Sequence, residues 1–168
     1  MASILVCDDE RSICQMLEID LRKEGYKVET VMTKDEARRK IDSAVFDVIV
    51  TDIRMPNTAD GMEVLSHARS VSPDSAVVLM TALAELETAI QAIKAGAFEY
   101  IVKQPGRINS EIKVAIARAL ETVTLRQQNF ALRRKRQIMR DVQVLKHLLR
   151  HPAENWRRNL SALVETYR

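Results

Sequence analysis

The sequence predicts an α/β fold built on a parallel sheet of five strands. Short apolar runs alternate five times with longer segments in which apolar residues recur every three or four positions, a pattern typical of βαβ units. The chain has 168 residues, of which 46% are hydrophobic and 29% charged. That size and composition fit one globular domain with an appendage, and argue against intrinsic disorder or a disulfide scaffold.

The expected strands are short and rich in β-branched residues. Val48-Ile49-Val50 and Val77-Val78 are the clearest examples, and Ser72-Pro73-Asp74 predicts a turn before the fourth strand. We expect strands at residues 3–7, 27–31, 46–51, 76–80 and 100–102.

The segments between these strands have helical periodicity. In the first of them, Leu17 and Leu21 belong to an apolar stripe. Gly25 and Gly96 follow the first and fourth helices at the position where a glycine commonly ends a helix. We expect helices at residues 11–24, 34–43, 62–70, 86–95 and from 108 onward.

The last of these helices has no clear end. Apolar residues continue at helical spacing from Ile108 to Leu149, although the four charges of residues 133–136 interrupt them. His151-Pro152 is the next helix breaker, and residues 156–167 form another amphipathic pattern.

Charge separates two parts of the chain. Residues 1–120 contain 15 Lys and Arg against 19 Asp and Glu, whereas residues 121–168 contain 11 against 4. A basic segment of this kind is either a solvated helix face or a surface for an acidic partner or nucleic acid. We therefore divide the chain into a domain of residues 1–122 and a helical extension of residues 123–168.

Several classes of protein are excluded or disfavoured. No apolar run approaches the roughly 20 residues that cross a bilayer. The first apolar run has no basic leader and is followed by three acids, so we expect no signal peptide and a cytoplasmic location. Cys7 and Cys14 lack metal-ligand spacing and fit buried, reduced thiols. No Gly-x-x-x-x-Gly-Lys-Ser/Thr loop occurs, which excludes a Walker-type ATPase site in this sequence.

Polar residues follow the expected strands at their carboxyl ends, where open parallel sheets bind ligands. Asp8 and Asp9 follow the first strand, Asp52 the third, Thr81 the fourth and Lys103 the fifth. Each residue alone is common in loops and helix caps. Together, three carboxylates on one edge require cations, and the Lys103 ammonium and Mg²⁺ meet that need. One carboxylate could then attack phosphorus.

Four stretches of the chain resemble a known family. They read ILVCDDE at residues 4–10, VIVTDIRMP at 48–56, VLMTA at 78–82 and GAFEYIVK at 96–103. Over about residues 3–122 the chain resembles the CheY-like receiver domain of two-component response regulators, and is most similar to receivers of NtrC-like transcription activators. The resemblance implies a doubly wound sheet of strand order 2-1-3-4-5 with helices on both faces.

The resemblance also implies a role for each polar residue at the strand ends. Asp52 matches the phosphoacceptor, and Asp8 and Asp9 match the acidic pocket that holds Mg²⁺. Thr81 matches the hydroxyl that binds the phosphoryl group, and Lys103 the cation beside it.

Two further positions have roles implied by the same family. The backbone carbonyl of Arg54 completes the metal shell, together with Asp52 as a ligand. Tyr100 matches the aromatic switch that turns inward when the Thr81 loop closes on the phosphate. The expected partner is a sensor histidine kinase, and the chain is expected to catalyse only its own phosphorylation and dephosphorylation.

The sequence departs from the family pattern at two places. Residues 57–61 reach their glycine one position later than usual. Gln104 separates Lys103 from Pro105, whereas the family has lysine followed directly by a proline, typically in the cis form. Both departures flank the site and could alter phosphoryl lifetime or kinase choice, but neither removes a catalytic group.

These observations leave alternatives for function and for the extension. The expected function is a phosphorylation-controlled switch that acts through helix four, strand five, helix five and the tail. The alternative is an interaction module that uses the fold without phosphorylation. For the extension, a dimerising helix or coiled coil is favoured over nucleic-acid binding through residues 133–136 and 157–158, and over a phosphoacceptor box at His147. The downstream target is not identifiable from the sequence.

Overall fold

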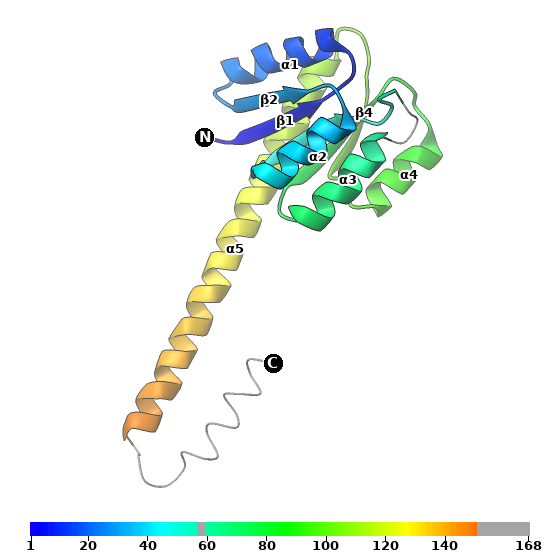
Figure 1. Ribbon diagram of the computed structural model, residues 1–168. Coiled ribbons are helices and arrows are strands. Elements are labelled where there is room, and N and C mark those ends of the chain that lie inside the picture. The colour runs from blue at the N-terminus through cyan, green and yellow to red at the C-terminus, as the bar shows by residue number, and fades with distance from the viewer. Residues whose placement is uncertain (57–59, 151–168) are drawn as a thin grey trace. The chain divides into compact units, whose positions relative to one another are not determined.

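The computed structural model describes residues 1–56 and 60–150 of the chain, with side chains up to residue 147. Strands and helices alternate along these ranges in the predicted order (Figure 1). The elements are β1 (Ser3–Cys7), α1 (Arg11–Lys23), β2 (Lys27–Val31), α2 (Lys34–Ser43), β3 (Val48–Asp52), α3 (Asp60–Val71), β4 (Ala76–Thr81), α4 (Leu86–Lys94), β5 (Glu99–Val102) and α5 (Ile108–Arg150).

The five strands form one parallel sheet in the order β2-β1-β3-β4-β5. Strand β1 lies between β2 and β3, and the chain then adds β4 and β5 on the far side of β3. The order therefore reverses direction at β1 and β3, which is the doubly wound arrangement. The predicted fold class and strand order are confirmed.

The boundaries of β1 and β2 match the predictions, whereas those of β3, β4 and β5 differ by one or two residues. β3 begins at Val48 instead of residue 46, and the Phe46 carbonyl accepts a hydrogen bond from the Ser75 hydroxyl at 2.6 Å instead of from a neighbouring strand. Phe46 is nevertheless buried. Its side chain thus belongs to the core although its backbone lies outside the sheet.

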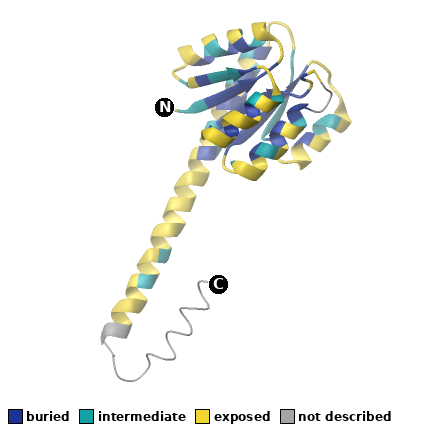
Figure 2. Cartoon of the chain, viewed as in Figure 1, coloured by how far each residue is buried: buried dark blue, intermediate teal, exposed yellow. Residues whose placement is uncertain are grey.

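Alternate residues of each strand pack into two separate cores, one on each face of the sheet. Ile4 and Val6 belong to the core that contains side chains of α1 and α5, whereas Leu5 and Cys7 belong to the core that contains side chains of α2, α3 and α4. The three central strands, β1, β3 and β4, are consequently buried on both sides (Figure 2). This explains why β1, β3 and β4 are continuous apolar runs in the sequence instead of alternating ones.

Two predicted glycine positions have the backbone conformation that requires glycine. Gly25 after α1 has φ +88°, and Gly96 after α4 has φ +94°. At these angles the Cβ of another residue would be strained, so glycine ends both helices. In each case the N–H of the glycine donates a hydrogen bond to a carbonyl in the last turn of the preceding helix.

The chain divides into two compact units, residues 1–125 and 126–168. Within the first unit, Ile112 and Ile116 of α5 are fully buried in the core that also contains side chains of α1. Within the second unit, α5 continues through the charged run at residues 133–136, and its apolar side chains are exposed, Phe130 by 69%. The amphipathic pattern at residues 156–167 lies outside the described residues. No helix in the described part is long and apolar enough to span a membrane.

We predict that Ile112→Ala lowers the free energy of unfolding by about 2–5 kcal/mol, because it leaves a cavity between α5 and the sheet. Val114→Ala, on the same helix at a position 58% exposed, is the matched control and should stay within about 0.5 kcal/mol of wild type. Urea unfolding followed by circular dichroism measures both. Equal losses for the two variants would contradict the packing of α5 on the sheet.

Candidate functional site

The parallel register brings the carboxyl ends of four strands to one edge of the sheet. β3 ends at Asp52 and β4 at Thr81, while Asp8 and Lys103 directly follow β1 and β5. Both of these flanking residues extend the sheet hydrogen bonding by one step. The Asp8 N–H donates to the Val31 carbonyl at 3.2 Å, and the Lys103 N–H donates to the Thr81 carbonyl at 2.6 Å. The backbone therefore fixes where each side chain starts.

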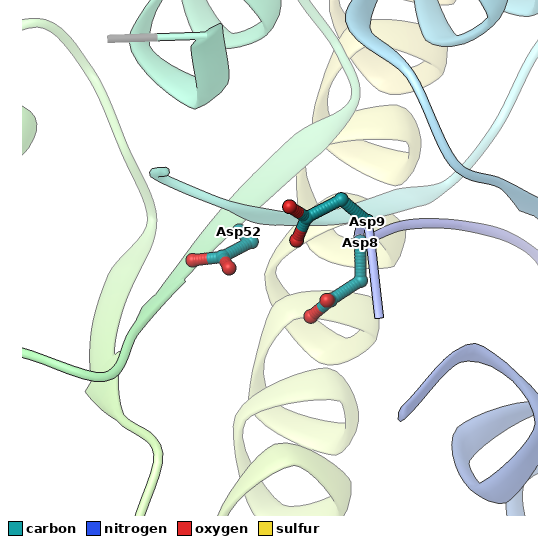
Figure 3. Close-up of side chains that lie close together, drawn as sticks. All are labelled: Asp8, Asp9 and Asp52. Atoms are coloured by element: carbon teal, nitrogen blue, oxygen red, sulfur yellow. The ribbon is translucent and has the colours of Figure 1, made fainter. Parts of the chain in front are cut away.

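Three carboxylates meet at this edge (Figure 3). One oxygen from each of Asp8, Asp9 and Asp52 can be chosen so that all lie within 4.8 Å of one another. Asp8 has no exposed surface and Asp52 is 5% exposed, whereas Asp9 is exposed. Two carboxylates of the cluster, Asp8 and Asp52, are thus buried, and the third, Asp9, is open to solvent.

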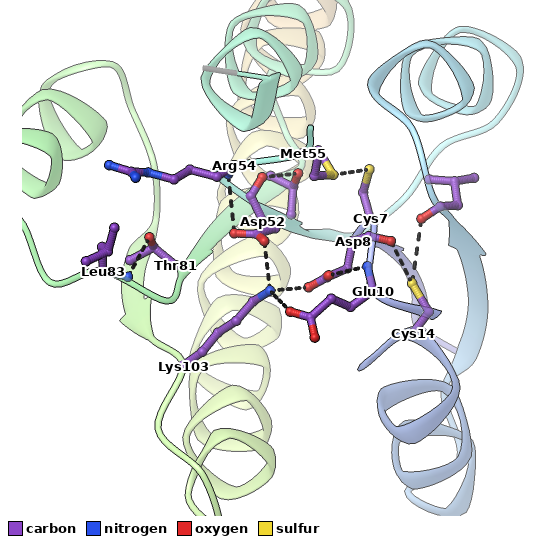
Figure 4. Close-up of polar contacts among 12 residues, drawn as sticks. Cys7, Asp8, Glu10, Cys14, Asp52, Arg54, Met55, Thr81, Leu83 and Lys103 are labelled. Carbon is purple, nitrogen blue, oxygen red and sulfur yellow. Dashed lines mark hydrogen bonds and ion pairs between the residues drawn. The ribbon is translucent and has the colours of Figure 1, made fainter. Parts of the chain in front are cut away.

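The side chain of Lys103 lies between the two buried carboxylates (Figure 4). Its Nζ is 2.7 Å from Asp8 Oδ2 and 2.8 Å from Asp52 Oδ2, and the Glu10 carboxylate is 3.6 Å away. The lysine side chain is only 9% exposed. One ammonium therefore compensates several acids at close range, which leaves the cluster with a net negative charge.

Burial raises the pKa of Asp8 above its usual value. The ion pair with Lys103 and the hydrogen bond from the Glu10 N–H at 2.9 Å act in the opposite direction but do not outweigh burial. For Lys103, burial alone would lower the pKa, but hydrogen bonds to Asp52 and Asp8 outweigh it and leave the pKa raised. Lys103 thus stays protonated, and ionising Asp8 costs more in the folded protein than in water.

The backbone of Arg54 contacts Asp52 Oδ1, the carboxylate oxygen that Lys103 does not bind. The Arg54 N–H donates to Asp52 Oδ1 at 3.4 Å, a long bond. The Arg54 guanidinium pairs instead with Glu85 at 2.9 Å in an exposed ion pair. The role of the Arg54 carbonyl as a metal ligand stays a prediction.

Thr81 and Tyr100 are connected through a single backbone residue, Leu83. The Leu83 N–H donates to Thr81 Oγ1 at 3.2 Å, and the Tyr100 hydroxyl donates to the Leu83 carbonyl at 3.1 Å. Thr81 is buried, whereas Tyr100 is partly exposed. Sequence reasoning missed Leu83, because a backbone contact leaves no signature in residue type.

The extra residue after Lys103 becomes part of the approach to α5. The Gln104 carbonyl accepts hydrogen bonds from the N–H groups of Arg107 and Ile108, each at 3.1 Å. All peptide bonds of residues 103–108 are trans. The Lys103 side chain still reaches the two buried carboxylates, so the site tolerates this departure from the family pattern. Most of the longer loop at residues 57–61 lies outside the described residues.

The two cysteines lie beside the site without joining it. Both are buried, and they form no disulfide. Burial raises the pKa of Cys7 to about 12 and that of Cys14 to about 11. The thiols therefore remain protonated and belong to the core, as predicted.

The fold and this group of side chains define an acidic site at the carboxyl edge of a doubly wound parallel sheet. Residues 4–114 match the response regulator receiver domain, and the chain belongs to that family. Receiver domains bind Mg²⁺ at an acidic pocket and interact with sensor histidine kinases, which agrees with the three clustered aspartates.

Relatives and solved structures place the chain within this family. It is 35% identical to the transcriptional regulatory protein ZraR of Salmonella typhimurium over 121 residues, which is 71% of this chain and 27% of ZraR. The beryllofluoride-activated NtrC4 receiver domain dimer is 37% identical with a TM-score of 0.67, covering 73% of this chain and 99% of that one. Response regulator TrrA of Thermotoga maritima, solved in complex with Mg²⁺ and beryllofluoride, is 32% identical with a TM-score of 0.63, covering 71% and 100%.

These comparisons confirm the resemblance to NtrC-like receivers. The chain spans about a quarter of the length of the curated relatives that it matches. Their activities as whole proteins therefore do not carry over to this chain directly.

We predict that Asp8→Asn stabilises the metal-free protein at pH 7. Since the pKa of Asp8 is raised in the folded state, the unfolded chain ionises first as pH rises, and wild type loses stability between the two pKa values. The gain from Asn should shrink as pH falls from the raised folded-state value toward the ordinary value of 3.8, and should stay constant below it. Urea unfolding in EDTA across pH 3–7.5 measures it. Asp74→Asn, an exposed control, should show little change, and a gain that grows toward acid would contradict the argument.

Proposed function

We propose that Asp52 accepts a phosphoryl group from a phosphohistidine of a sensor histidine kinase, and that the chain is a phosphorylation-controlled switch. One observation carries this proposal. The Lys103 ammonium lies within 2.8 Å of both Asp8 and Asp52, next to a third carboxylate, at the carboxyl edge of a parallel sheet. Such a site holds a nucleophile, a fixed cation and room for further positive charge.

In the proposed step, an Asp52 carboxylate oxygen attacks phosphorus. The new O–P bond forms as the P–N bond to the kinase imidazole breaks, and the imidazole takes the electron pair and then a proton. Lys103, fixed by two carboxylates, places positive charge next to the oxygens of the transferring group. The Leu83 N–H uses a lone pair of Thr81 Oγ1, so the hydroxyl proton can be donated to a phosphoryl oxygen.

The donor set fits Mg²⁺, which prefers oxygen ligands and commonly uses one or two carboxylates. Asp8, Asp9, Asp52 and the Arg54 carbonyl would hold it. When bound, the ion would supply positive charge to the acids and to the phosphoryl oxygens. The raised pKa of Asp8 shows that Lys103 alone does not offset the cost of burying this carboxylate.

The switch would run from Thr81 to Tyr100 through Leu83. Movement of Thr81 toward a phosphoryl group would pull on the Leu83 N–H, and the Leu83 carbonyl holds the Tyr100 hydroxyl. The neighbouring helix α4 exposes Leu86 and Ile93 by 75% and 52%. A shift of this loop would therefore change an apolar surface that a partner can bind.

Self-association would use α5 and its extension. The exposed apolar residues of α5 beyond the first unit favour a helical dimer, and the NtrC4 receiver forms a dimer when activated by beryllofluoride. The basic run at residues 133–136 opposes a continuous coiled coil, so we place the contacts before Leu132 and after Ile138. We keep residues 1–122 as the receiver and 123–168 as the dimerising segment, acting in the cytoplasm, with nucleic-acid binding as the lesser alternative.

We predict that acetyl phosphate or beryllofluoride with Mg²⁺ modifies wild type and leaves Asp52→Asn unmodified, because the nucleophilic oxygen is gone. Asp74→Asn retains Asp52 and should be modified like wild type. Intact mass measures the acetyl phosphate product, and ¹⁹F NMR measures bound beryllofluoride. Equal modification of wild type and Asp52→Asn would rule out Asp52 as the acceptor.

The same samples separate the switch from a phosphorylation-independent module. Mg²⁺ titration followed by amide NMR should perturb residues at the sheet edge at millimolar concentrations, and Asp9→Ala should weaken the affinity about tenfold, because it removes one ligand. A module without phosphorylation need not respond to the ion.

We predict that the full chain is a dimer at tens of micromolar and that truncation after Thr122 makes it a monomer with unchanged Asp52 phosphorylation. Burying a few Leu and Ile side chains contributes roughly 1.5–3 kcal/mol each, enough for association at that concentration. Sedimentation velocity with and without beryllofluoride tests this. A full chain that sediments as a monomer in both states would exclude the dimerising role.

A further inference from the structure

The first turn of α3 lies directly against the backbone of the proposed phosphoacceptor. A Cβ on Gly61 would overlap the Asp52 carbonyl oxygen and would also come within 2.7 Å of the Ile53 Cα. The Gly61 N–H donates to the Ile53 carbonyl at 3.0 Å. Gly61 therefore packs directly against the Asp52–Ile53 peptide.

The residue before this glycine is a buried acid that is paired with a lysine from another helix. Asp60, the first residue of α3, is 3% exposed. Lys34, the first residue of α2, places its Nζ 2.9 Å from Asp60 Oδ1 and 3.0 Å from the exposed Glu63 carboxylate. The lysine thus joins the N-terminal turns of α2 and α3.

The start of α2 is itself fixed. The Thr33 side chain caps the helix by accepting the Glu36 N–H at 3.2 Å, and the Met32 N–H donates to the Glu36 carboxylate at 3.0 Å. Hydrogen bonds to Asp60 and Glu63 raise the pKa of Lys34, so it stays charged. Lys34 therefore holds Asp60 from the capped start of α2. Removing Lys34 would leave the buried Asp60 carboxylate with less positive charge nearby.

We propose that Lys34 is a positioning residue for Asp52, acting through Asp60 and Gly61. This inference rests on the proposed phosphorylation of Asp52. The ion pair fixes the first turn of α3, and Gly61 in that turn packs against the Asp52–Ile53 peptide. The Asp52 carboxylate is thereby held in its position beside Lys103. Because phosphoryl transfer depends on alignment, a small displacement of Asp52 slows the reaction without removing any reacting group.

Lys34→Met should lower the maximal rate of Asp52 modification by acetyl phosphate, in saturating Mg²⁺, about tenfold. Lys34→Arg keeps the charge and should restore most of the rate. Lys34→Met with Asp60→Asn removes the buried charge that has lost its lysine partner and should recover part of the rate. The amide NMR shifts of Asp52, Ile53 and Gly61 should move in Lys34→Met, because the displacement reaches that peptide.

Lys40→Met is the matched control, since Lys40 lies on the same helix and pairs with Glu29 at 2.7 Å away from α3. It should leave the rate and the three amide shifts unchanged. Lys34→Gln, which retains a hydrogen-bond donor, replaces Lys34→Met if the latter does not fold, and should also be slow.

The outcomes separate the two proposals. Wild type that acetyl phosphate does not modify would contradict the proposed function. Modified wild type with an equally fast Lys34→Met or Lys34→Gln would overturn the positioning role. Equal slowing by Lys34→Met and Lys40→Met, or no rescue by Lys34→Arg and by the double variant, would overturn it as well.

Discussion

The burial of one lysine between two carboxylates is the constraint on which the rest of this site depends. Asp8 and Asp52 are carried by neighbouring strands and would repel each other without a cation. Lys103 follows β5, the edge strand on the far side of β4. Its Nζ nevertheless lies within 2.8 Å of both carboxylates. Burial raises the pKa of Asp8 despite this partner. Lys103 alone therefore does not supply enough positive charge to offset the burial of the acids. This deficit of positive charge makes the site suited to a divalent cation.

The sheet and its flanking helices serve this electrostatic arrangement. Parallel register places the four strand ends together, and the two apolar cores keep the strands from shifting. The surrounding contacts divide into those that hold the nucleophile and those that respond to it. Gly61 and Asp60 hold the Asp52 backbone from α3, whereas Leu83 links Thr81 with Tyr100. The site is thus in close backbone contact with α3 on one side and hydrogen-bonded to the loop after β4 on the other.

Much of this arrangement follows from residue type and order. Alternation of apolar runs and helical periodicity predicts the strands, and the parallel topology then places Asp8, Asp52 and Lys103 at one edge. The sequence does not reveal which groups pair, because pairing depends on three-dimensional distance. Lys34 and Asp60 lie on different helices, and nothing in their local sequence connects them. Leu83 contributes only backbone atoms to its contacts with Thr81 and Tyr100. β3 begins later than its apolar pattern suggests, and a side-chain hydroxyl occupies the Phe46 carbonyl.

The central claim is that Lys103 and a divalent cation supply complementary positive charge to the same acids. The most direct test compares wild type with Lys103→Met at pH 8, measuring Mg²⁺ affinity by amide NMR and the rate of Asp52 modification by acetyl phosphate. Removing a nearby cation should tighten Mg²⁺ binding several-fold, since less repulsion opposes the ion, while the modification rate should fall by about tenfold or more. Weaker Mg²⁺ binding, or an unchanged rate, would contradict this account of the site.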